Sequence, residues 1–190
     1  SPTEKSELIR LSPLCCLPSR VVVSSLELCI PGNTYRRRVT TLAVSTQIAV
    51  VDASIGDTPA QRNLERELDA ETTVFEASEE ERPPTPASRR WTFDGVVVSG
   101  SQTAVYNDHD WIHELTEWAR RVHAAGIPAL GVCWGHQFFA QALGGRVVDM
   151  GEYELGYQTV ERVGEDPLFE GVPATFTSFE THSDRVAELP

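Results

Sequence analysis

The sequence predicts an α/β fold in which a mostly parallel central sheet is flanked by helices. Short apolar, β-branched runs alternate with segments of helical periodicity, as in chains that build parallel sheets. A Gly-x-Cys-x-Gly turn at residues 131–135 joins one of these strands to a helix. Hydrophobic residues make up 41% and charged residues 23%, which is typical of a globular domain. Because every apolar run is far shorter than the ~20 residues of a membrane span, we expect no membrane partner.

The strands and helices follow one another at the spacing of such a fold. Four buried strands are expected at residues 47–52, 72–75, 93–99 and 128–132. Helices are expected after Thr58-Pro59, from about residue 110 to Gly126, and from about Trp134 to Leu143. Residues 77–90 carry glutamates and prolines without apolar periodicity, so they read as an exposed loop. Beyond Arg146, shorter strands are expected at residues 147–148, 157–163 and 175–179.

The charge of the chain is strongly acidic. Asp and Glu total 28 against 16 Lys and Arg, a net charge of −12. A surface this negative repels phosphate backbones, so we expect no nucleic-acid partner. Lys5 is the only lysine, and the other basic side chains are arginines. This pattern suggests a halophile-like surface, a hypothesis that predicts unfolding at low salt.

Residues 1–46 differ from the remainder of the chain. They hold six basic and three acidic groups, whereas residues 47–190 hold ten basic and 25 acidic ones, a net of −15. They also hold three of the four cysteines, so Cys133 alone remains in the body, which fits a reducing, cytoplasmic setting. We expect residues 1–46 to be a poorly ordered extension, with Arg36-Arg37-Arg38 as a solvated basic tail, and residues 47–190 to form the domain.

The turn at Cys133 has the pattern of a nucleophile elbow. A nucleophile on a sharp strand-to-helix turn needs a strained backbone, and side chains two positions before and after it would collide there, hence Gly131 and Gly135. The sulfur would lie over the N-terminus of the next helix, where the helix dipole favours a thiolate. The backbone N–H of Trp134 could then serve an oxyanion hole. The alternative is a buried core cysteine beside a glycine-rich turn.

The loop after the strand at residues 93–99 is the second candidate. In a parallel sheet, loops at the carboxyl ends of neighbouring strands converge on one crevice. Backbone N–H groups near Gly100 and Ser101 could therefore face Cys133. The alternative is a simple turn.

Gly131–Gln137, GVCWGHQ, resembles the elbow of class I glutamine amidotransferases, including the glutamine four residues after the cysteine. Ser99-Gly100-Ser101 stands where that family carries its glycine-rich oxyanion loop. Residues 181–186, THSDRV, are similar to the segment that contacts the substrate glutamine. The nearest pattern is the amidotransferase part of GMP synthase and its stand-alone relatives. The resemblance covers residues 47–190 and implies a flavodoxin-like architecture.

The resemblance also implies a reaction and roles for individual residues. Cys133 would attack the side-chain amide of L-glutamine and form a thioester, with the backbone of Gly100 and Trp134 holding the oxyanion. Ammonia would pass to a synthetase subunit or domain, and no cofactor or metal is expected. The residues implied near the bound glutamine are Ser101, Gln137, Ser183 and Asp184.

One part of the family pattern has no counterpart in this sequence. The family takes its acid–base pair from a His-Pro-Glu motif beyond the cysteine, and none occurs in the 57 residues after Cys133. We therefore expect a domain that is incomplete at its C-terminus. His182 is a candidate substitute base, although its surroundings match a non-catalytic segment. Two alternatives stay open: a catalytically incomplete binding or regulatory relative, and a γ-glutamyl cysteine hydrolase of the same fold.

Overall fold

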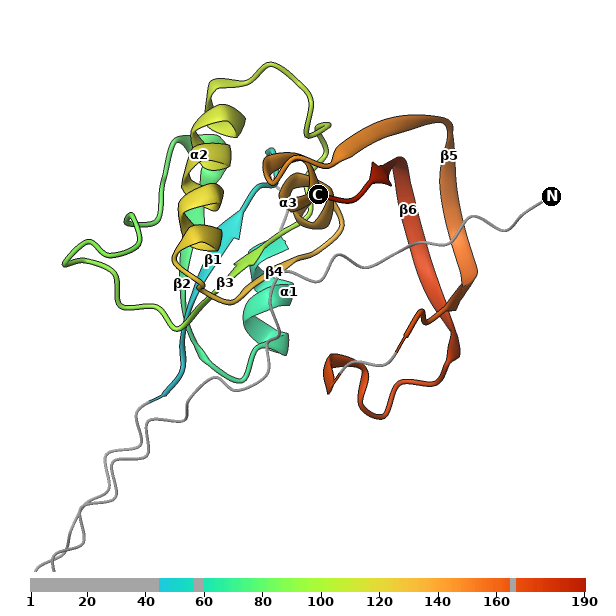
Figure 1. The fold of residues 1–190 in the computed structure, drawn as a ribbon, viewed down its shortest axis with the longest axis horizontal. Helices are drawn as coiled ribbons and strands as arrows, with labels where there is room; N and C mark the ends of the chain where they lie inside the picture. Colours follow the sequence, from blue (N-terminus) through green and yellow to red (C-terminus); the bar gives the residue numbers. More distant parts are fainter. Residues whose placement is uncertain (1–44, 57–59, 165–166) are drawn as a thin grey trace, which may run out of the picture.

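The computed structural model describes residues 45–56, 60–164 and 167–190, and within these it contains a four-stranded sheet and a two-stranded hairpin (Figure 1). The sheet has the order β2-β1-β3-β4 and all its neighbouring strands are parallel. Its strands are β1 (Gln47–Asp52), β2 (Glu71–Glu76), β3 (Gly95–Val98) and β4 (Ala129–Gly131). The prediction of a mostly parallel α/β fold is confirmed. The predicted extension at residues 1–46 lies outside the described residues except for its last two positions.

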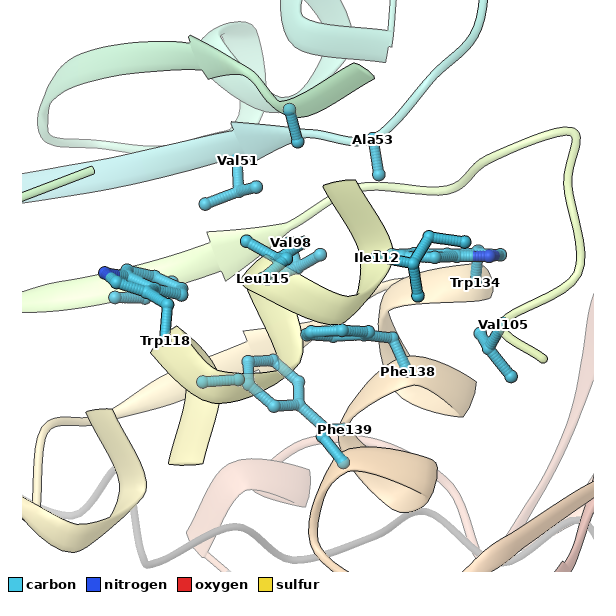
Figure 2. Close-up of a cluster of buried hydrophobic side chains, with 14 of the residues drawn as sticks. Val51, Ala53, Val98, Val105, Ile112, Leu115, Trp118, Trp134, Phe138 and Phe139 are labelled. Carbon is cyan, nitrogen blue, oxygen red and sulfur yellow. The ribbon is translucent and has the colours of Figure 1, made fainter. Parts of the chain in front are cut away.

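Helices cover both faces of the sheet. Alternate β1 side chains point to opposite faces, with Val51 toward α2 (Asp110–Ala124) and α3 (Trp134–Ala142) and Val50 toward α1 (Ala60–Glu67). The larger core lies on the α2/α3 face (Figure 2). There Trp134 stacks on Phe138 with ring centroids 5.0 Å apart, which fixes the start of α3 against the core.

A buried carboxylate organises the turn between β1 and α1. Asp52 is 4% exposed at the end of β1, and its Oδ2 accepts a 2.9 Å hydrogen bond from the backbone N–H of Gln61 in the first turn of α1. A carboxylate at this position satisfies an N–H group that the helix itself leaves unpaired. Thr58 and Pro59, after which this helix was expected to begin, lie outside the described residues.

The C-terminal part of the chain forms one long hairpin of β5 (Arg146–Glu161) and β6 (Thr175–Glu188), which stands off the parallel sheet (Figure 1). The strands expected at residues 147–148 and 157–163 are therefore parts of β5, joined through a register shift between Asp149 and Glu154. Gly151, with φ +77°, lies within that shift and provides a backbone conformation that other residues rarely adopt. The strand expected at residues 175–179 continues to residue 188.

The two faces of the hairpin have different environments. Large apolar side chains on the outward face are more than half exposed: Tyr153, Leu155, Tyr157 and Phe179. The opposite face carries Glu154, Glu180, His182 and Asp184, which are partly or fully buried. This alternation is the normal consequence of the two-residue period of a strand. It turns the polar and acidic side chains of β6 toward the body of the protein.

Candidate active site

Cys133 occupies the junction between β4 and α3 with a strained backbone. Its φ is +54° and its ψ is −108°, a conformation that costs a non-glycine residue about 1–3 kcal/mol. It is the N-cap residue of α3, and its side chain makes no capping hydrogen bond. Part of the residue is open to solvent, although neighbouring atoms surround much of the thiol. The backbone geometry therefore matches the predicted elbow and presents the sulfur at the start of a helix.

The two flanking glycines are required by packing. A Cβ atom on Gly131 would lie 2.3 Å from the carbonyl carbon of Gly135, and one on Gly135 would lie 2.3 Å from the backbone oxygen of Val98. Both distances are shorter than real Cβ contacts. The neighbours are backbone atoms, which cannot move aside as a flexible side chain can. The turn at Cys133 can therefore be this tight only with glycine at both positions.

The electrostatic environment of Cys133 differs from the expectation drawn from the helix dipole. Loss of solvent around the thiol raises the pKa of Cys133 above its ordinary value of 9.0, and the carboxylates of Glu180 and Asp184 raise it further. The backbone N–H of Trp134 acts in the opposite direction and lowers it. Loss of solvent, reinforced by the two carboxylates of β6, therefore outweighs the hydrogen bond from the helix N-terminus and raises the pKa of the thiol. The direction of this shift is opposite to the one expected from the helix dipole.

Gly100 lies directly beside the cysteine. A Cβ built on Gly100 would be 3.7 Å from the Cβ of Cys133. The residue before it, Ser99, is 1% exposed, and its Oγ lies 2.8 Å from the Gly100 carbonyl oxygen and 3.2 Å from Oδ1 of Asp52. Ser99 also accepts a 2.9 Å hydrogen bond from the N–H of Ala53. The loop after β3 thus reaches the elbow, as expected, and a buried hydroxyl anchors its first residue.

The next residues of this loop are held by local hydrogen bonds. The N–H of Thr103 donates to the Ser101 hydroxyl at 3.4 Å, and the N–H of Ile55 donates to Oε1 of Gln102 at 2.8 Å. Gln102 therefore ties the loop to the segment after β1. The structure places Ser101 in the predicted loop, next to Gly100, and its contact with a substrate stays a prediction.

Gln137 and Asp184 are brought together although they are far apart in the sequence. Gln137 is 8% exposed, and its Nε2 donates a 2.9 Å hydrogen bond to the backbone oxygen of Asp184. Asp184 is itself 9% exposed. The bond fixes the Ser183-Asp184 segment of β6 against the first turns of α3. In this structure Gln137 positions the predicted glutamine-binding segment.

His182 lies on β6 between two carboxylates. Its Nε2 is 3.0 Å from Oε2 of Glu154 on β5, and its Nδ1 is 3.5 Å from Oε2 of Glu180. Both ring nitrogens are thus turned toward acidic partners. To take a proton from Cys133, His182 would have to leave one of these carboxylates, so its role as the base stays a prediction that the geometry does not favour.

Sequence reasoning missed Tyr106, which borders the site. The Tyr106 hydroxyl, in the loop after β3, donates a 2.9 Å hydrogen bond to Oδ1 of Asp184. The two residues are 78 positions apart. No local pattern could have paired them, because the contact depends on how the hairpin folds back over the loop.

The fold and the site define a class of α/β proteins in which a parallel sheet carries a cysteine at a strand-to-helix turn beside a glycine-containing loop. The chain belongs to one family within it: residues 49–190 match the model of the family "Glutamine amidotransferase class-I". The expected membership of the class I glutamine amidotransferases is thereby confirmed.

Individual relatives agree with this family. The chain is 40% identical over 96 residues to GMP synthase [glutamine-hydrolyzing] of Thermomicrobium roseum, covering 50% of this chain and 17% of that protein. It is 36% identical over 131 residues to the protein of the same name from Thermosipho melanesiensis, covering 68% of this chain and 23% of that protein. The chain thus spans about a fifth of the length of these relatives.

Solved structures support the fold. A glutamine amidotransferase from Thermotoga maritima superposes with a TM-score of 0.63 at 20% identity, covering 74% of this chain and 62% of that one. A glutamine amidotransferase from Methylobacillus flagellatus gives a TM-score of 0.63 at 22% identity, covering 77% of this chain and 59% of that one. Within the part of this chain that the structure describes, no helix has the length and apolar character to cross a membrane.

Proposed function

We propose that this domain catalyses the glutaminase half-reaction of an amidotransferase, with Cys133 as the nucleophile. The observation that carries the proposal is the strained elbow of Cys133, which Gly131 and Gly135 make possible. A strained backbone persists only where the surrounding packing enforces it, and such residues gather at functional sites. The names of the curated relatives, GMP synthase [glutamine-hydrolyzing], support the choice of substrate.

The reaction proceeds in two chemical stages. Cys133 loses its proton, and the sulfur attacks the side-chain carbonyl carbon of L-glutamine. The oxyanion of the tetrahedral intermediate accepts hydrogen bonds from the backbone N–H groups of Gly100 and Trp134. The C–N bond breaks, the leaving nitrogen takes up the proton that Cys133 released, and ammonia departs. Water then attacks the γ-glutamyl thioester, releasing glutamate and restoring the thiol.

The remaining predicted residues form the walls of the glutamine site. Ser101 lies on the loop beside Gly100, and Ser183 and Asp184 lie on β6, which Gln137 fixes to α3. Ammonia passes to a synthetase partner or domain that aminates a second substrate. The relatives' names support this arrangement, because a synthase that hydrolyses glutamine must use the nitrogen elsewhere.

A diazoketone analogue of glutamine tests the proposal on the full 190-residue chain. The reagent should alkylate Cys133, and peptide mass spectrometry should locate the adduct there. Cys15, Cys16 and Cys29 are internal controls for unspecific labelling. Cys133→Ser should abolish the site-specific adduct and any release of glutamate from glutamine. Absence of an adduct at Cys133 in the wild-type chain would contradict the proposal.

A second candidate is a glutamine-binding relative without turnover. Two observations favour it: the pKa of Cys133 is raised, and both ring nitrogens of His182 face carboxylates. This candidate predicts alkylation of Cys133 by the glutamine analogue together with no release of glutamate from glutamine. Both candidates predict the Cys133 adduct, so the release of glutamate from glutamine by the wild-type chain is the measurement that separates them.

A further inference from the structure

The hydrogen bond between Tyr106 and Asp184 joins two walls of the site. Tyr106 belongs to the loop after β3 that begins at Gly100, and Asp184 belongs to β6. The hydroxyl and Oδ1 of the carboxylate are 2.9 Å apart. The Tyr106 side chain is on the surface, with 46% of the residue exposed, whereas Asp184 is 9% exposed. The loop thus reaches a buried acceptor through the tip of an otherwise exposed ring.

Asp184 is also hydrogen-bonded to α3, the third element that lines the site. Its backbone oxygen accepts the Nε2–H of Gln137, one helical turn after Cys133. Asp184 therefore contacts the loop through its side chain and α3 through its backbone. Since Gly100 lies beside Cys133, the loop, β6 and α3 meet around the nucleophile.

The loop is fixed at both of its ends. Near its start, Ser99 is bound to Asp52 and Gln102 is bound to the N–H of Ile55. At its other end, the Tyr106 hydroxyl binds β6. A hydroxyl donating to a carboxylate makes a stronger hydrogen bond than a neutral pair does. Loss of solvent around the hydroxyl and the hydrogen bond to Asp184 raise the pKa of Tyr106 to about 12.

We propose that Tyr106 is a positioning residue that holds the Gly100 loop against β6. The backbone N–H of Gly100 and the Ser183-Asp184 segment are then both held at the positions in which they contact the substrate. Tyr106 touches no reacting atom and acts through Asp184 and the loop. This inference rests on the proposed function, because it assigns Tyr106 to the same glutamine site.

Tyr106→Phe removes the hydroxyl and keeps the ring. Tyr153→Phe is the matched control, because the Tyr153 hydroxyl lies 2.6 Å from Thr181 Oγ1 on the outward face of the same hairpin. We expect the second-order rate constant for Cys133 labelling by the diazoketone glutamine analogue to fall about tenfold in Tyr106→Phe, the loss of one hydrogen bond to a charged group. It should not change in Tyr153→Phe.

Labelling with iodoacetamide distinguishes a positioning role in the glutamine site from a purely structural role at the elbow. This small reagent needs no glutamine site, so its rate constant with Cys133 should be the same in wild type and Tyr106→Phe. Equal slowing of both reagents would overturn the inference, because it would mean general damage to the elbow. Equal labelling of wild type and Tyr106→Phe by the glutamine analogue would also overturn it while leaving the proposed function intact. A wild-type chain that the analogue does not label would instead contradict the proposed function.

Discussion

The side-chain amide of Gln137 donates a 2.9 Å hydrogen bond to the backbone carbonyl of Asp184, 47 residues further along the chain. The bond is buried and connects the elbow helix α3 to β6. A residue that the family pattern associates with the substrate therefore also holds the two elements of the site together. Its removal should weaken the fold as well as the site.

Gln137→Ala should lower the free energy of unfolding by about 1–3 kcal/mol, because the Asp184 carbonyl loses its partner in a buried place. Urea denaturation measures the change. Gln158→Ala is the control, since Gln158 is exposed on β5 and its replacement should leave the stability nearly unchanged. Equal stability of Gln137→Ala and the wild type would mean that water replaces the amide.

Gly135→Ala should destabilise the protein by about 3 kcal/mol or more, because the new Cβ would meet the Val98 backbone oxygen at 2.3 Å. Gly126→Ala is the matched control. Gly126 also has a positive φ, +67°, but open space around it, so only backbone strain of about 1–2 kcal/mol is expected. Thermal and urea unfolding should rank the two variants in this order, and a reversed order would contradict the packing argument.

Cys133 should ionise at a higher pH in the folded chain than in the unfolded one. Burial, Glu180 and Asp184 raise its pKa, so the folded state prefers the neutral thiol. The resulting stabilisation is complete below the pKa of the unfolded thiol and is lost as the pH rises through the folded pKa. The pH profile of iodoacetamide labelling, mapped to Cys133 in native buffer and in urea, measures both values. A native midpoint below the unfolded one would contradict the prediction.

Glu180→Gln should lower the pKa of Cys133, because it removes one of the two carboxylates that raise it. Cys133 should then react faster with iodoacetamide at neutral pH. Glu161→Gln, an exposed substitution at the far end of β5, provides the control and should leave the rate unchanged. An unchanged rate in Glu180→Gln would mean that solvent screens this charge from the sulfur.

The thermal midpoint should rise with added sodium chloride if the acidic surface is halophile-like. Residues 47–190 carry 25 acidic and ten basic groups, so like charges repel one another at low ionic strength, and salt screens the repulsion. Sucrose stabilises proteins without screening charge and serves as the control. A thermal midpoint that does not depend on salt would sink the halophile hypothesis.

The parallel sheet and the elbow could be predicted from local patterns. Buried strands such as residues 47–52 are marked by β-branched runs. The elbow can be recognised from Gly131-x-Cys133-x-Gly135 alone, because the steric constraints on the turn act within these five residues. The hairpin could be predicted only in fragments. Its strands alternate exposed and inward residues over an irregular register, so the apolar runs that mark buried strands are missing.

The sequence by itself determined the α/β class, the position of the cysteine that we propose as the nucleophile, and the need for glycine on each side of it. The tertiary structure decided the charge around Cys133 and the partners of Gln137, Tyr106 and His182. These depend on β6, which lies about 50 residues beyond the elbow and contributes one face to the site. Local propensity acts over a few residues, whereas the pKa of a thiol depends on every charge that folding brings near it. The sequence therefore predicted that the helix dipole would favour a thiolate, whereas the burial and the carboxylates that folding brings to the sulfur raise the pKa of Cys133.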